Sequence, residues 1–118
     1  SYFEEGKKLF NNKEYVNSKI YFEKDIVFNP KNKNSYLYLA KLFKKKEKDN
    51  LEENNLNTVL LLDPKNEEAI YLLALLNIKK SNFSKVRELI LTMESVCKKM
   101  CSTTIEIKKK LDESQKSK

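Results

Sequence analysis

Few side chains in this 118-residue sequence could perform chemistry on a substrate. There is no His, and the two cysteines, Cys97 and Cys101, are four residues apart. Two thiols without an imidazole can neither complete a tetrahedral zinc site nor form a thiolate–imidazole pair. Acidic residues come in pairs at expected helix starts, where the helix dipole accounts for them: Glu4–Glu5, Glu52–Glu53 and Glu67–Glu68. The sequence therefore predicts a protein that is not an enzyme and that binds no cofactor or metal.

The spacing of the two cysteines also indicates in which cellular compartment the protein is expected. On a continuous helix, two side chains four residues apart share a face, but a disulfide usually needs a closer approach than one helical turn gives. We therefore expect Cys97 and Cys101 to be buried or half-buried thiols in a reducing compartment, which predicts a cytoplasmic or nuclear protein.

The composition favours long helices with short connections. Only one Gly and two Pro are present, far fewer turn residues than a β-sandwich or a doubly wound α/β fold needs.

The net charge of +7 comes almost entirely from Lys, because Arg87 is the only Arg. Proteins that recognise specific bases or phosphates favour Arg, so this composition indicates a generally basic surface rather than nucleic-acid binding. No apolar run reaches membrane-spanning length. The chain starts with Ser1 and shows no signal peptide, so we expect a segment of a longer protein.

Two segments recur at a displacement of 34 residues. The stretch 28–32 (Phe-Asn-Pro-Lys-Asn) returns at 62–66 (Leu-Asp-Pro-Lys-Asn), and 36–40 returns at 70–74. A proline cannot continue a helix and also restricts the residue before it, so Pro30 and Pro64 mark helix ends. Small residues recur where the helices of a pair must approach closely: Gly6, Ala40, Ala74 and, on the opposing helix, Ser18.

This period and its proline stop resemble the tetratricopeptide repeat family. The resemblance implies an all-α fold, an α-solenoid of three antiparallel helix pairs followed by a C-terminal capping or extended helix. We assign residues 1–100 to the repeat domain, with repeats of about 1–32, 33–66 and 67–100. Residues 101–118 form a C-terminal helix and a frayed basic tail.

Apolar spacing predicts helices and no strands. The expected ranges are 2–12, 15–28, 34–47, 51–62, 67–80 and from 83 onward. Asn32 and Asn66 are expected N-caps. The middle repeat is irregular, because Glu52 occupies the place of a small residue, and Asp49 with Glu52 forms a predicted capping box.

The tail allows two interpretations. Heptad spacing predicts one continuous helix over about 83–114, a possible homodimer contact through a seam: Met93, Cys97, Met100, Ile107 and Leu111. Alternatively, the helix breaks near Cys101–Ser102, Thr103 and Glu106 cap a fresh helix, and that helix covers the exposed apolar face of the third pair.

In the tetratricopeptide family the first helix of each pair lines a groove that binds a partner's peptide or helix. Carried over by position, the groove residues are Phe3, Lys7, Phe10, Leu37, Tyr38, Lys41, Lys44, Lys45, Tyr71, Leu75 and Ile78. Such a groove, basic in its middle and apolar at one end, suits an acidic partner with apolar anchors. The protein is then an adaptor or scaffold.

Some cochaperones of the family grip a chaperone's C-terminal carboxylate with Lys, Asn, Asn, Lys and Arg. The matching places here hold Phe3, Lys7, Tyr38, Glu68 and Leu72, so we expect no such clamp. The main alternative is a structural or self-associating segment of a larger complex. Nucleic-acid binding is disfavoured, because the aromatic residues are not interleaved with lysines on one face.

Overall fold

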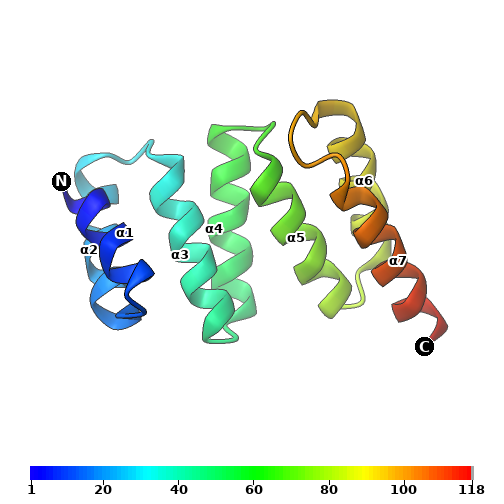
Figure 1. The fold of residues 1–118 in the computed structure, drawn as a ribbon, viewed down its shortest axis with the longest axis horizontal. Helices are drawn as coiled ribbons and strands as arrows, with labels where there is room; N and C mark the ends of the chain where they lie inside the picture. The colour runs from blue at the N-terminus through cyan, green and yellow to red at the C-terminus, as the bar shows by residue number, and fades with distance from the viewer. Residues whose placement is uncertain (118) are drawn as a thin grey trace. The chain divides into compact units, whose positions relative to one another are not determined.

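The computed structural model describes residues 1–117, and this part of the chain contains seven helices and no strand. Within residues 1–63, and again within residues 64–117, consecutive helices run antiparallel (Figure 1). Their bounds are α1 Tyr2–Asn11, α2 Tyr15–Phe28, α3 Lys33–Lys45, α4 Asp49–Leu62, α5 Glu67–Lys79, α6 Phe83–Val96 and α7 Thr103–Lys116. The predicted all-α class is confirmed, and the predicted start of every one of the first six helices is within two residues of the observed one.

The chain divides into two compact units. Unit 1, Ser1–Asp63, contains α1 to α4, and each of its helices packs on the next. Unit 2, Pro64–Lys118, contains α5 to α7, and there α7 packs on both α5 and α6. Among the residues that the structure describes, no helix has the length and apolarity needed to cross a bilayer.

Helices α1 and α2 approach closely at Gly6. A Cβ atom on Gly6 would lie 2.9 Å from Cε1 of Phe22, whose side chain is completely buried. The Ser18 hydroxyl donates to the Gly6 carbonyl at 2.8 Å in the same contact. The sequence-based expectation of small residues at Gly6 and Ser18 is therefore explained by the absence of space between the two helices.

A buried carboxylate organises the junction between α2 and α3. Asp25 is 2% exposed and accepts hydrogen bonds from the side chains of Ser35 (2.6 Å), Asn32 (2.8 Å) and Asn29 (3.0 Å). Burial by itself raises the pKa of this carboxyl, but the hydrogen bonds from Ser35, Asn32 and Asn29 outweigh it, so the pKa of Asp25 is lowered. The network ties the end of α2 to the start of α3.

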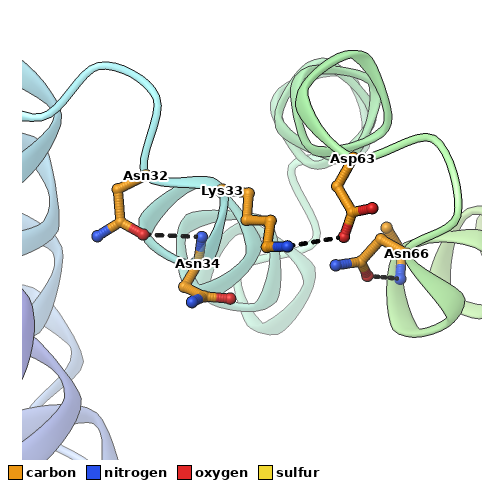
Figure 2. A network of polar contacts seen from close by, with 6 residues as sticks. Asn32, Lys33, Asn34, Asp63 and Asn66 are labelled. Atoms are coloured by element: carbon orange, nitrogen blue, oxygen red, sulfur yellow. Dashed lines mark hydrogen bonds and ion pairs between the residues drawn. The ribbon is translucent and has the colours of Figure 1, made fainter.

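Both expected asparagine caps are present (Figure 2). The Asn32 side chain accepts from the Asn34 amide at 3.1 Å at the start of α3. In unit 2, the Asn66 side chain accepts from the Ala69 amide at 2.9 Å and so caps α5. Beside the first cap, an ion pair of 3.0 Å between Lys33 and Asp63 joins the start of α3 to the end of α4 within unit 1 (Figure 2).

The predicted capping box of the middle repeat is wrong. Helix α4 starts at Asp49, which is therefore a helical residue, and the N-cap position belongs to Lys48, which makes no side-chain capping bond. Glu52 lies inside the helix and is only 2% exposed. The turn has the expected length of three residues but lies two residues earlier, at 46–48, where Glu47 adopts a positive φ of 55° and reverses the chain.

The prediction of one continuous helix over about 83–114 is also wrong, and the alternative interpretation, in which the helix breaks, is correct. Helix α6 ends at Val96, and Cys97 has an extended backbone. The predicted cap is displaced by one residue: Ser102 takes the N-cap position without a side-chain bond, and Thr103 donates instead to the Met100 carbonyl at 2.6 Å.

Candidate partner-binding faces

Aromatic side chains from three helices meet in unit 1. The Tyr38 ring of α3 stacks on the buried Phe22 ring of α2, with 5.0 Å between ring centroids. Phe3 and Phe10 of α1 contact Tyr38 edge to face at 5.9 and 5.1 Å, and Tyr15 contacts Phe10 at 5.5 Å. Except for Phe22, these rings are half-buried, so each is held by the core and also reaches solvent.

Two lysines lie directly over these rings. The ammonium of Lys41 is 4.8 Å from the centroid of Tyr38, and that of Lys45 is 5.1 Å from Tyr15 and 5.9 Å from Phe10. These are cation–π distances. We call this surface the aromatic–lysine face and define it as Phe3, Phe10, Tyr15, Tyr38, Lys41 and Lys45.

The arrangement corrects one sequence-based argument. We expected the aromatic residues to be separate from the lysines, but the structure interleaves them. The reason is that Tyr38 and Lys41 are three residues apart on α3 and so share a face, while helix packing brings Phe10 and Tyr15 beside Lys45. Only the contact between Tyr38 and Lys41 joins residues that are close in sequence.

The other groove residues predicted in unit 1 differ in accessibility. Lys7, in the middle of α1, and Lys44, in the last turn of α3, are both exposed. Leu37 is 6% exposed and so offers almost no surface to a partner.

In unit 2 the predicted groove residues lie on α5 and face a helix of the same chain. Tyr71, Leu75 and Ile78 are all half-buried, and α7 packs on α5. The Tyr71 hydroxyl donates to the Glu106 carboxylate of α7 at 2.6 Å, and this bond, followed by burial, raises the pKa of Tyr71. Ile78 borders a shallow hollow of about 470 Å³ together with Lys110 and Glu113 of α7.

The residues of the predicted self-association seam are mostly inside the chain. Met93 and Ile107 are completely buried, and Leu111 is 7% exposed. Thr104, Ile107 and Leu111 are the buried residues of α7 and form the stripe by which it packs on α5 and α6. Met100 is half-buried in the turn between α6 and α7.

The expectation of free thiols is wrong, because Cys97 and Cys101 form a disulfide. Their Cα atoms are 5.2 Å apart, within the range that a disulfide requires. This approach is available because α6 stops at Val96 and the chain turns back between the two cysteines. The disulfide also removes the argument for a reducing compartment.

Sequence reasoning also missed the role of Glu67, which was explained only by the helix dipole. One carboxylate oxygen, Oε1, accepts the backbone amides of Lys98 (2.8 Å), Lys99 (3.1 Å) and Met100 (3.0 Å). These hydrogen bonds lower the pKa of Glu67, and those from Met100 and Lys98 have the largest effect. The only signal in the sequence was the missing proline at Lys98, where the repeat pattern calls for one.

The structure shows no group of three or more metal-ligating side chains within residues 1–117. No protein-family model and no curated protein matches the sequence. Among solved structures, the chain is similar to the TPR2B domain of yeast Sti1, determined in a complex with pHsp70. The identity is 16%, the TM-score is 0.79, and the match covers 96% of this chain and 92% of that one. At this identity the likeness shows the fold alone, which is a tetratricopeptide-like array of helix pairs.

Proposed function

We propose that the chain is a non-catalytic protein-interaction module, and that the aromatic–lysine face of unit 1 binds an acidic peptide or helix with apolar anchors. The observation that carries the proposal is the set of half-exposed rings beneath lysine ammonium groups. The rings are held in place by Phe22 and by one another, so a partner would bind them without an added cost of ordering flexible side chains.

The chemistry of this face favours carboxylates beside apolar side chains. A partner carboxylate can pair with Lys41 or Lys45, while Leu or Phe side chains pack on the edges of Tyr38 and Phe10. Aromatic anchors of this kind contribute most of the energy at protein interfaces, and the exposed lysines mainly accelerate association. We therefore expect affinity to depend on the rings and the association rate to fall with salt.

A single-stranded nucleic acid is the second candidate, because it also uses basic grooves with aromatic rings. Base stacking needs an open ring face. The Tyr38 ring is stacked on Phe22 and has Lys41 close to it, and Lys45 lies over both Phe10 and Tyr15. Because these ring faces are already covered, we favour an acidic peptide over a nucleic acid as the ligand.

The proposed mode differs from the carboxylate clamp of chaperone-binding relatives. The places of the clamp residues hold Phe3, Lys7, Tyr38, Glu68 and Leu72. Phe3 and Tyr38 are committed to a ring contact at 5.9 Å, and Glu68 would repel a terminal carboxylate. We expect this chain not to bind a peptide through its C-terminal carboxylate, so amidating the C-terminus of a bound peptide should leave its affinity unchanged.

Selection from a random peptide library, followed by affinity measurement with the best synthetic peptide, tests the proposal. Selected peptides should be rich in Asp and Glu beside Leu or Phe, and Tyr38→Ala should weaken binding about 30-fold, the loss expected for a hot-spot residue. Because Tyr38 also packs on Phe22, the surface change Lys45→Glu provides an independent test, for which we expect about a tenfold loss.

Lys24 offers a matched control, because it also lies over two rings, Tyr2 at 5.7 Å and Tyr21 at 5.2 Å. Lys24→Glu should leave peptide affinity within about twofold if the aromatic–lysine face alone is used. Equal losses for Lys45→Glu and Lys24→Glu would show a general charge effect and contradict the proposal. Tight, salt-dependent binding of a single-stranded oligonucleotide with no peptide selected would favour the second candidate.

A further inference from the structure

Six residues, 97–102, connect α6 to α7, and a disulfide closes the first five of them into a loop. Cys97 leaves α6 with an extended backbone, and the disulfide brings Cys101 back beside it, only two residues before α7 starts at Thr103. The loop contains no proline and no glycine. Because no proline fixes its backbone, the disulfide is the covalent restraint on its conformations.

The closed loop presents three consecutive backbone amides to one point. The amides of Lys98, Lys99 and Met100 all donate to Oε1 of Glu67, the first residue of α5. Three successive amides can converge in this way only when the backbone between them is tightly turned. Closure of the loop by the disulfide and its attachment to α5 are therefore geometrically coupled.

Beyond the loop, few contacts hold α7. Its buried residues are Thr104, Ile107 and Leu111, and its polar contacts to neighbouring helices include the Tyr71–Glu106 hydrogen bond and the exposed Lys108–Glu94 ion pair at 3.0 Å. A helix of 14 residues is marginal in isolation, and an exposed ion pair contributes little. The position of α7 therefore depends strongly on how its first residues are held.

We propose that the Cys97–Cys101 disulfide and the Glu67 carboxylate form a redox-responsive clasp that holds α7 on α5, and that reduction by a dithiol loosens α7 and uncovers Tyr71 and Ile78. Reduction opens the loop, so the three amides no longer converge on Glu67. Helix α7 then keeps its narrow buried stripe and its surface polar contacts but loses the attachment at its start, and the surface of α5 that it covers becomes more accessible.

The reaction is ordinary thiol–disulfide exchange with an external dithiol. A thiolate of the dithiol attacks Sγ of Cys101, which belongs to the more exposed of the two cysteines, and Cys97 leaves as a thiolate that takes up a proton. The second thiol of the reductant then displaces Cys101 and forms a cyclic disulfide. Two electrons and two protons pass to the protein, which ends with two thiols.

Amide hydrogen exchange on the full chain tests the clasp, with dithiothreitol as the dithiol and alkylation followed by mass spectrometry to count thiols. Adding the reductant should accelerate exchange in α7 about tenfold, while α1 and α2 in unit 1 remain unchanged. The double variant Cys97→Ser/Cys101→Ser should exchange at the reduced rate and should not respond to dithiothreitol. Unchanged α7 exchange in a chain with two confirmed free thiols would overturn the proposal.

A second variant tests the carboxylate separately. Glu67→Ala in the oxidised chain should also accelerate α7 exchange and should make the disulfide more easily reduced, because the loop is no longer attached to α5. Glu88→Ala is the control: it removes an exposed carboxylate of α6 that forms an ion pair with Lys85 at 3.5 Å, and it should have neither effect. Failure of the cysteines to form an intramolecular disulfide under an oxidised glutathione buffer would equally refute the clasp.

Discussion

The junction after the first helix pair and the junction after the third are both held by a carboxylate, but by different means. In unit 1, Asp25 is buried and accepts bonds from side chains on both sides of the proline turn between α2 and α3. In unit 2, Glu67 lies at the surface and accepts backbone amides from a loop that lacks the proline and carries a disulfide instead. A turn without proline is here restrained by a covalent bond.

The two helices that follow these junctions are also attached differently. Helix α3 is buried along much of its length, whereas α7 buries one narrow stripe. The difference indicates that a junction inside a repeat array is stabilised by packing. At the last helix, by contrast, a few polar and covalent contacts carry more of the attachment. Four measurements would break or sharpen this comparison.

The largest effect should come from Asp25→Asn. An amide cannot accept all three hydrogen bonds and places a donor among donors, so we expect a loss of about 2 kcal/mol in the free energy of unfolding of unit 1 at neutral pH. Denaturant unfolding monitored by hydrogen exchange in α1 to α3 measures it. A loss below about 0.5 kcal/mol would show that packing alone holds the junction.

The same carboxyl gives this junction a pH dependence. Because the folded pKa of Asp25 is lowered below its ordinary value of 3.8, its stabilisation is fully present above that value and is lost as the pH falls through the folded pKa. Asp25→Asn should therefore flatten the acid side of the stability profile of unit 1. An unchanged profile would assign the acid sensitivity to other groups.

Gly6→Ala should have an intermediate effect. Alanine favours a helix by about 1 kcal/mol over glycine, but its Cβ would overlap the buried Phe22 ring, and overpacking costs about 1–3 kcal/mol. We expect a net destabilisation of about 1 kcal/mol, measured by thermal or denaturant unfolding. Combining it with Phe22→Leu should cost less than the sum of the two single changes. Strict additivity would mean that the two sites do not share the tight contact.

The smallest effect should be a shift in the titration of Glu67. The backbone amides of Met100, Lys98 and Lys99 lower the pKa of this carboxyl, and the positive charge of Lys99 is a lesser cause. Glu68 is the charged residue next to it in sequence. Its contribution to holding the loop is present above the ordinary pKa of 4.5 and is lost as the pH falls through the folded pKa. Carboxyl carbon NMR should show a lowered pKa in the oxidised chain and a value nearer 4.5 after reduction. The same pKa of Glu67 in the oxidised and the reduced chain would show that Glu67 is not coupled to the disulfide.

Much of the fold could be predicted because the deciding signals are local. The period of 34 residues, the proline stops and the apolar spacing predicted α2 with its observed bounds and the Asn32 and Asn66 caps. Apart from the continuous last helix, the failures in the fold concern single residues near helix starts. Asp49 and Thr103 suit both the N-cap and the first helical position, and a side chain's suitability does not decide between two adjacent places.

The candidate site was predictable only in part. Tyr38 and Phe10 were identified from their repeat positions, and the structure brings them together at 5.1 Å. The overlap of Lys45 with Tyr15 joins α3 to α2 and has no counterpart in sequence spacing. Likewise, Tyr71 was correctly placed on the first helix of the third pair, but its hydroxyl is bonded to Glu106, 35 residues further along the chain.

By itself, the sequence determined the helices and their pairing, because helix formation and termination depend on residues within a few positions of one another. Only the tertiary structure decided which helix covers which face, that the last helix breaks after Val96, and that Cys97 and Cys101 are bonded. The distance between two cysteines four residues apart depends on where the helix ends, and that end is set by the docking of α7 and the bonds to Glu67. Contacts between residues distant in sequence settled these points, and no local pattern encodes them.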